Sequence, residues 1–259
     1  MDPSRWDADQ VTQSLTPDTL LHNTAGVSGA APTAMVVGST GPFATLAGRT
    51  ALQCGGSATD AAITTALTQI ALAAGSWVSY AGVFCMVHYS AGSKGTTSLS
   101  AGFATFAGET EPAGIPSPPQ RSGRTALVPG FMAGAQAAHD RFGTLAWGDL
   151  FAPAVHIAER GFPVGAVRAQ QFALRADVLP SSFRAVRGDT FRQPELARTL
   201  RAIATDGADY MYRGPWAHRF VDTVRRAGGH AAYQDLADYR PIWAEPAREV
   251  ASASMRYTH

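Results

Sequence analysis

Histidine is the residue type in this chain best suited to bind a metal ion or to act in catalysis. No two of the seven histidines show the H-x-x-x-H or H-E-x-x-H spacing that places two imidazoles on one face of a helix, so we expect no metal site. His88 lies in a β-prone run and His156 in an apolar helical stretch, which favours structural roles for both. The full set is His22, His88, His139, His156, His218, His230 and His259.

The two cysteines, Cys54 and Cys85, stand in apolar or glycine-rich surroundings. A single pair in a chain of this length does not make a disulfide scaffold. Free cysteine packs as a small hydrophobic residue, so we expect two buried thiols.

Several motifs that carry chemistry are missing from the sequence. It has no G-x-S-x-G nucleophile turn, no G-x-x-x-x-G-K-[ST] phosphate loop and no G-x-G-x-x-G dinucleotide fingerprint. We therefore expect no cofactor, and the residue pattern by itself singles out no catalytic side chain.

Composition excludes further classes of function. The 259 residues are 46% hydrophobic and 16% charged, which excludes an intrinsically disordered chain. A formal net charge of +1 gives no electrostatic reason to expect a nucleic acid partner. No apolar run approaches the roughly 18 residues of a membrane-spanning helix. Lys94 is the only lysine beside 20 arginines, a bias typical of GC-rich bacterial genomes.

The first residues lack the basic and then apolar pattern of a secretory signal, so we expect a cytoplasmic protein. Residues 1–32 show no clear period and are interpreted as an irregular N-terminal arm. Residues 33–259 are interpreted as one domain. It begins with a buried strand at residues 34–37 and a helix at residues 45–53.

The best-marked helix is expected over residues 58–74, because Ser57 and Asp60 have the spacing of a capping box. Residues 83–89 and 96–107 are β-prone and flank a turn, which predicts a hairpin. A loop rich in proline and serine follows at 108–124. Helical patterns marked by proline near the start or glycine at the end then cover residues 130–142, 147–160, 194–205 and 215–227; residues 233–239 fit a short helix and 241–255 an extended segment.

This order of elements favours a layered α+β fold, with the strands in one sheet and the helices packed on it. A series of short sequence motifs also resembles the motifs of a known family. Over about residues 33–259 the chain resembles γ-glutamyltranspeptidases in segments that follow one another in that family's order. The matching segments are residues 35–48, 55–62 (GGSATDAA), 128–130 (VPG), 142–147, 152–154, 158–164 (AERGFPV), 191–200 (FRQPELARTL), 212–214 and 235–239.

The resemblance implies an αββα fold of the N-terminal-nucleophile hydrolases. In that family a precursor cuts itself into two subunits, and the new N-terminal threonine of the small subunit attacks the substrate with its own α-amine as base. This chain resembles the large subunit only, and the C-terminal part of that subunit is missing after Tyr257-Thr258-His259. We therefore expect no catalytic residue in this chain, a small (β) subunit that completes the sheet, a small-molecule substrate, and neither a nucleic acid nor a membrane as partner.

Two departures from the family pattern concern the substrate. Family members carry an arginine after the hairpin, in R-E-T-A-P, that pairs with the α-carboxylate of the glutamyl group. Here Gly102 or Phe103 stands at that place. The family's glycine-rich segment is replaced by SWVSYAGV at residues 76–83. We expect Gly102, Phe103, Trp77, Ser79 and Tyr80 to line the substrate site, with core packing as the alternative for the aromatic residues.

Three hypotheses for function remain open. The first is an atypical hydrolase of C–C bonds in α-keto acids, similar to transpeptidase-like enzymes of actinobacterial 4-alkylproline pathways (lincomycin, hormaomycin, pyrrolobenzodiazepines). The second is a γ-glutamyl hydrolase or transferase in which Arg121 or Arg124 binds the carboxylate. The third is an inactive scaffold subunit.

Overall fold

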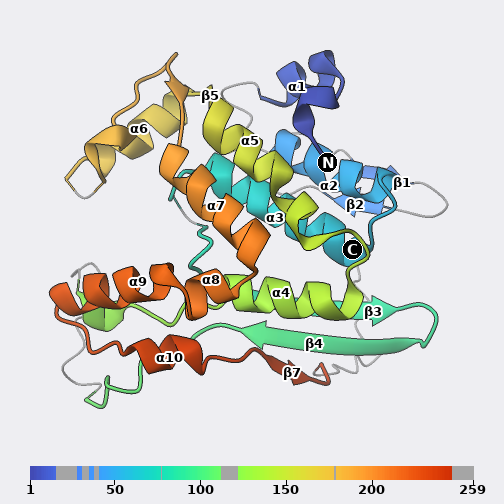
Figure 1. The fold of residues 1–259 in the computed structure, drawn as a ribbon. Coiled ribbons are helices and arrows are strands. Elements are labelled where there is room, and N and C mark those ends of the chain that lie inside the picture. Colours follow the sequence, from blue (N-terminus) through green and yellow to red (C-terminus); the bar gives the residue numbers. More distant parts are fainter. Residues whose placement is uncertain are drawn as a thin grey trace, which may run out of the picture.

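The computed structural model describes residues 1–15, 28–30, 35–37, 41–76, 78–111, 122–177 and 179–246. Two regions are distinguished in Figure 1: a helical part built around α3, and a sheet covered by α4. The longer helices are α2 (Pro42–Gln53), α3 (Ala58–Ala73), α4 (Phe131–Phe142), α5 (Ala152–Arg160), α6 (Ala166–Leu174), α7 (Pro194–Asp206) and α9 (Pro215–Arg226).

Shorter elements connect these helices. They are η1 (Pro3–Arg5), α1 (Ala8–Ser14), η3 (Gly123–Thr125), η4 (Trp147–Phe151), η5 (Ser181–Phe183), α8 (Asp209–Tyr212) and α10 (Tyr233–Ala237). Two small antiparallel pairs join β1 (Ser28–Ala30) to β2 (Met35–Val37) and β5 (Phe162–Pro163) to β6 (Thr190–Phe191).

Helix α3 forms the centre of the helical part and confirms the predicted capping box. The Ser57 hydroxyl accepts from the Asp60 amide at 3.1 Å, and Asp60 Oδ2 accepts from the Ser57 amide at 2.8 Å. Most of its side chains are buried against α2, α5 and η4. Helix α2 packs so closely that a Cβ on Gly48 would lie 2.0 Å from Thr65 Oγ1, which explains the glycine.

The predicted hairpin is present as β3 (Phe84–Ser90) and β4 (Gly95–Ala101), and β7 (Ile242–Ala244) pairs with the far side of β4. The strand order is therefore β3-β4-β7. One face packs on α4 and buries residues such as Leu99. The opposite face, which carries Val87 and Tyr89, is exposed. Among the described residues, the sheet thus has one face covered by α4 and one uncovered face.

Several features differ from the sequence expectations. The described strands form three small sheets rather than the one sheet expected, because β1 and β2, and likewise β5 and β6, pair only with each other and not with the hairpin. The second hairpin strand ends at Ala101 rather than at residue 107, because Phe103 adopts a left-handed backbone (φ 54°) that breaks the ladder. The helix expected over residues 147–160 is 3-10 in η4 and becomes α-helical at Ala152, beside Pro153. Helix α6 was not predicted, and the arm contains the short helix α1.

The prediction of two buried thiols is wrong: Cys54 and Cys85 are both exposed. Cys54 ends helix α2 at a surface turn, and Cys85 points to the uncovered face of the sheet. Trp77, Arg121 and residues 247–259 lie outside the described residues. Among the helices described, none is both long and apolar enough to cross a membrane.

Candidate functional site

The base of the β3–β4 hairpin brings together the two segments that the sequence singled out for substrate binding. A Cβ placed on Gly102 would lie 2.8 Å from the Cβ of Val83, so the end of β4 is in contact with the residue that precedes β3. The segments that carry Ser79 and Tyr80 and that carry Gly102 and Phe103 therefore meet at Val83 and Gly102.

The start of helix α4 fixes this surface from behind. The amides of Gly130 and Phe131 both donate to the carbonyl of Gly82 at 2.8 Å, and the Val128 amide donates to Ala104 at 2.8 Å. A Cβ on Gly130 would lie only 1.9 Å from the carbonyl oxygen of Ala101. Glycine is required here because any side chain would push α4 away from the hairpin.

A buried tyrosine holds the first turn of α4. The Tyr212 hydroxyl donates to the carbonyl of Pro129 at 2.6 Å and accepts from the Ala133 amide at 3.0 Å. Its ring stacks on Tyr239 at 5.9 Å between centroids. Burial raises the pKa of the Tyr212 phenol, so the hydroxyl keeps its proton and remains a donor.

Phe103 is the most unusual residue of this surface. Its φ of 54° lies in the left-handed region, which an aromatic residue rarely occupies, and its side chain is 76% exposed. Such backbone strain costs on the order of 1–3 kcal/mol and gathers at functional sites. The burial of its own ring cannot compensate for this cost.

Ser79 and Tyr80 form the neighbouring turn. The Ala81 amide donates to the Ser79 hydroxyl at 3.0 Å, the Gly82 amide donates to the Ser79 carbonyl at 3.0 Å, and Ser79 is exposed. Tyr80 is half-buried, and its ring meets Trp216 edge-on at 6.1 Å. This contact fits the core-packing alternative for Tyr80.

Arg124, the second candidate for binding a carboxylate, already has an acidic partner. Its Nε donates to Glu109 Oε2 at 2.8 Å and its Nη2 to the Glu111 carbonyl at 3.0 Å. The bond from Arg124 lowers the pKa of Glu109, and so does the bond from the His230 amide, while burial opposes them. Binding a substrate carboxylate at Arg124 would require breaking this pair.

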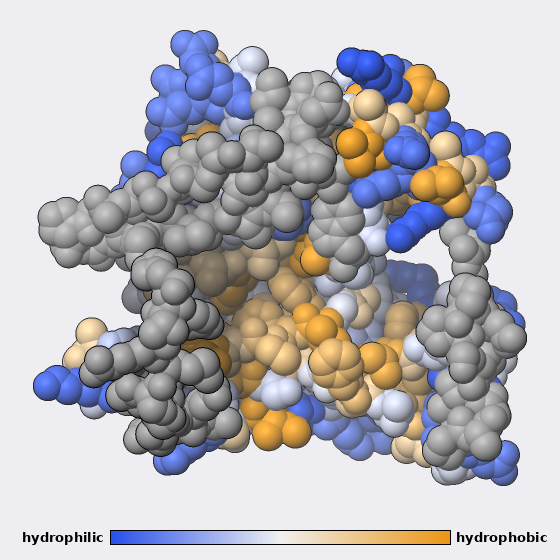
Figure 2. All heavy atoms as spheres, turned by 180° about the vertical axis from the view of Figure 1, so that it is seen from behind, coloured by the Kyte–Doolittle hydropathy of each residue, from blue (hydrophilic) through white to orange (hydrophobic). Residues whose placement is uncertain are grey.

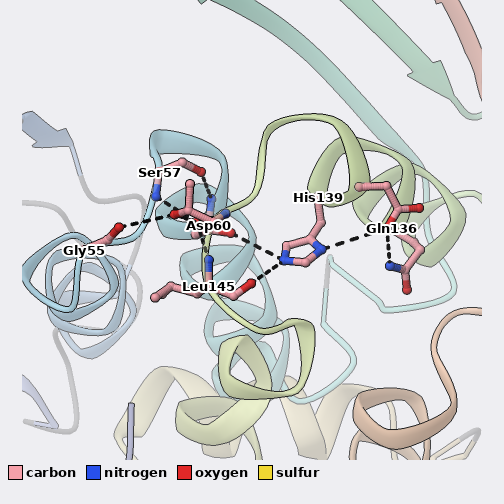
Figure 3. A network of polar contacts seen from close by, with 8 residues as sticks. Gly55, Ser57, Asp60, Gln136, His139 and Leu145 are labelled. Atoms are coloured by element: carbon pink, nitrogen blue, oxygen red, sulfur yellow. Dashed lines mark hydrogen bonds and ion pairs between the residues drawn. The ribbon is translucent and has the colours of Figure 1, made fainter.

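A polar cluster away from the hairpin is shown in Figure 3. Asp60 is fully buried, and its Oδ2 accepts four bonds, from the Ser57 amide, the Thr144 amide and hydroxyl, and the Leu145 amide. Its Oδ1 lies 3.7 Å from His139 Nε2, which is 2.8 Å from the Leu145 carbonyl. The sequence identified Asp60 only as a cap, because its partners are more than 80 residues away along the chain.

The pKa of the Asp60 carboxyl results from opposing effects. Burial raises it, but the bonds from Thr144, Ser57 and Leu145 favour the charged form, and the pKa lies below its ordinary value. Asp60 therefore ties the start of α3 to the loop after α4. In the described part of the chain, no three His, Cys, Asp or Glu side chains gather in a group that could hold a metal ion.

The face of the β3-β4-β7 sheet that points away from α4 carries exposed apolar side chains. Figure 2 views the molecule from the side opposite to Figure 1 and shows apolar side chains gathered in its lower half, below a hollow. The exposed residues of this face and its margin are Val83 (40%), Val87 (68%), Tyr89 (61%), Phe103 (76%) and Ile242 (67%). The central strand contributes Thr96, Ser98 and Ser100 to this face, so apolar side chains on the two outer strands flank a polar row. Several exposed large apolar side chains near one another suit this face to an interface.

Comparisons with known proteins agree with this architecture. The family model described as gamma-glutamyltranspeptidase matches residues 44–256. The glutathione hydrolase proenzyme of Pseudomonas aeruginosa is 37% identical over 145 residues, which are 52% of this chain and 26% of that protein. The chain thus matches about a quarter of the length of this curated relative.

Solved structures give the same family. The γ-glutamyltranspeptidase of Pseudomonas nitroreducens, solved in complex with L-DON, aligns with a TM-score of 0.67 and 29% identity, over 85% of this chain and 67% of that chain. The Helicobacter pylori γ-glutamyltranspeptidase has the same fold, with a TM-score of 0.74 and 24% identity over the same shares. The fold is therefore the α+β fold of these N-terminal-nucleophile hydrolases, as expected. Because the family model extends over most of its length, this chain belongs to the γ-glutamyltranspeptidase family.

Proposed function

We propose that this chain is the large subunit of a hydrolase whose small subunit supplies the catalytic N-terminal threonine. The observation that carries this proposal is the uncovered apolar face of the β3-β4-β7 sheet. Two sheets that pack face to face bury their inner faces about 10 Å apart. Among the described residues, only one of the two sheets is present. A second sheet from the small subunit would cover Val87, Tyr89 and Ile242.

The chemistry follows from the partner's nucleophile. The threonine hydroxyl attacks a substrate carbonyl and its α-amine takes the proton. The role of this chain would be to hold the substrate against that hydroxyl with residues 79–80 and 102–103 at the base of the hairpin. The two subunits would come from one self-cleaving precursor or from companion chains.

We further propose that the substrate is an α-keto acid and that the bond cleaved is C–C, as part of actinobacterial 4-alkylproline biosynthesis. Residues 99–105 contain no arginine to pair with an amino acid carboxylate, and the exposed ring of Phe103 stands there instead. An aromatic surface favours a planar, conjugated substrate over the zwitterionic head of a glutamyl group. An α-keto acid keeps a carboxylate but has no ammonium group.

The atoms of this reaction balance with water alone. The threonine attacks the α-keto carbonyl (C2) of a 2,4-dioxo acid and gives a tetrahedral oxyanion. Collapse of this oxyanion breaks the C2–C3 bond and expels an enolate. The enolate takes up a proton and leaves as a ketone. Water then hydrolyses the acyl ester on the threonine and releases the carboxylic acid.

A γ-glutamyl hydrolase is the second candidate, because the relative from Pseudomonas aeruginosa is a glutathione hydrolase proenzyme. Arg124 would have to leave Glu109 to serve this reaction, and Arg121 would be the other source of a cation. The two candidates therefore differ in the charge that the hairpin base must recognise.

A substrate comparison separates them. The chain, produced together with its small subunit, is assayed with acetylpyruvate as the 2,4-dioxo acid and with glutathione. We expect kcat/KM for acetylpyruvate to exceed that for glutathione, and F103R to shift the preference towards glutathione. Turnover of glutathione alone by the wild type, with loss of binding in R124A or R121A, would replace the first candidate with the second.

A further inference from the structure

A buried arginine of α6 binds the last carbonyls of α3. Arg168, on α6, is only 2% exposed. Its Nη2 donates to the Leu72 carbonyl at 2.9 Å and its Nη1 to the Ala73 carbonyl at 2.7 Å. A cation at a helix C-terminus interacts favourably with the carbonyls left without intrahelical donors.

The same guanidinium reaches beyond the helix to Ser76. Arg168 Nη1 donates to the Ser76 hydroxyl at 2.5 Å, and that hydroxyl donates to Gln171 Oε1 at 3.1 Å. Arg175 binds the main chain of the same residue, with Nη1 2.9 Å from the Ser76 carbonyl. Ser76 is therefore fixed through both its side chain and its backbone by residues of α6 and its C-cap.

The backbone between α3 and Ser76 makes a sharp turn that needs such support. Ala74 and Gly75 have φ angles of 49° and 75°, two left-handed residues in succession. For alanine this conformation is strained, and such strain persists only where the surrounding contacts over-determine the path of the chain. The contacts of Arg168 and Arg175 supply that constraint.

We propose that Arg168 is a positioning residue, which acts through Ser76 to set the place of the turn that carries Ser79 and Tyr80. Ser79 follows Ser76 by three positions, so the anchor at Ser76 fixes where the candidate substrate-binding turn begins. Burial lowers the pKa of Arg168 to about 10, which still leaves it charged at neutral pH. The proposal rests on the proposed function in assigning Ser79 and Tyr80 to the substrate site.

The test uses the chain with its small subunit and the variants S76A, R175A and R168K. S76A removes the hydroxyl link while Arg168 keeps its bonds to α3, and R168K keeps the charge but not the fork of donors. R198A, which removes an exposed arginine paired with Glu195 on α7, is the matched control. Hydrogen–deuterium exchange is followed for residues 75–83 and, as a reference, for residues 58–70 of α3.

We expect hydrogen–deuterium exchange at residues 75–83 to rise about tenfold in S76A and R175A, with residues 58–70 unchanged. Fewer contacts must then be broken for the turn to open locally. KM for acetylpyruvate should rise about tenfold with kcat within about twofold, since a displaced turn weakens substrate binding. R168K should fall between the wild type and S76A, and R198A should match the wild type.

Two results would overturn the proposal. One is unchanged exchange at residues 75–83 in both S76A and R175A. The other is a uniform rise in exchange over α3 and α6 with unaltered KM, which would leave Arg168 with a purely structural role. If the wild type turned over neither acetylpyruvate nor glutathione, the proposed function would fail, whereas the exchange result would still decide whether Arg168 fixes the turn.

Discussion

Phe103 is the residue of the candidate site whose backbone conformation is least expected for its type. A left-handed aromatic residue with 76% of its surface exposed contributes strain and little packing. Our proposal places a substrate between the two subunits next to Gly102, where β4 ends. In that proposal, Phe103 serves substrate binding rather than folding.

Two substitutions of Phe103 separate the cost of its backbone strain from the role of its ring in substrate binding. F103G should raise the free energy of unfolding by about 1 kcal/mol relative to F103A, because only glycine relieves the left-handed strain while both lose the ring. Both variants should raise KM for acetylpyruvate to a similar degree. Urea unfolding and steady-state kinetics measure the two effects, and equal stability of F103G and F103A would contradict the strain.

Asp60 shows how a single buried carboxylate can link distant segments. Its pKa is depressed in the folded state, so the unfolded chain binds a proton more readily than the folded chain. The stabilisation is fully present above the unfolded pKa of about 3.9 and is lost as the pH falls through the folded value.

D60N tests this linkage. At neutral pH we expect a loss of about 1–3 kcal/mol, because the amide donor would face His139 Nε2 where Oδ1 now lies. The difference between wild type and D60N should stay constant between about pH 6 and 5 and shrink as the pH is lowered from there towards 3, since protonation then removes the charge from the wild type. Urea unfolding over this range measures the difference, and a pH-independent gap would exclude a depressed pKa at Asp60.

At the scale of elements, the close approach of α4 to the hairpin is the contact that forms the candidate site. G130A should lose about 1–3 kcal/mol of stability or more, because its Cβ would meet the backbone of Ala101, which cannot rotate away. G92A, in the hairpin turn with no atom within 4 Å of its Cβ, is the control and should change stability by less than about 0.5 kcal/mol. Thermal unfolding measures both, and a neutral G130A would show that α4 does not abut the hairpin.

The elements predicted correctly are those with strong local signals. The capping box at Ser57 and Asp60 and the turn between residues 90 and 95 act within a few residues, so the sequence alone marks α3 and the hairpin. Helix α6 was missed because it starts after Gly165 with no side-chain cap. The end of β4 was missed because the β-prone pattern continues past Ala101, and nothing in it marks the left-handed backbone of Phe103.

The candidate site was predictable only in part. The motif order located Gly102, Phe103, Ser79 and Tyr80 along the chain, and the structure places their two segments in contact. The supporting contacts of Tyr212 and Arg168 were not predicted, because each joins residues more than 80 positions apart. Cys85 was misjudged because its strand has one face without a covering layer in the described residues.

At the scale of the whole molecule, the uncovered face of the β3-β4-β7 sheet is the proposed interface with the small subunit. V87E, at a side chain that is 68% exposed, should leave the stability of the chain itself within about 0.5 kcal/mol. It should abolish co-purification with the small subunit, because the interface would then bury an unpaired charge. V186E, at an exposed loop residue away from the sheet, is the control and should co-purify normally.

The central claim is that the active protein consists of this chain and a partner that begins with threonine. Intact-mass spectrometry and N-terminal sequencing of the natively purified protein test it most directly. The account predicts a second, co-purifying chain with threonine as its first residue. This chain alone, with no companion at any stage of purification, would contradict the account and favour an inactive scaffold.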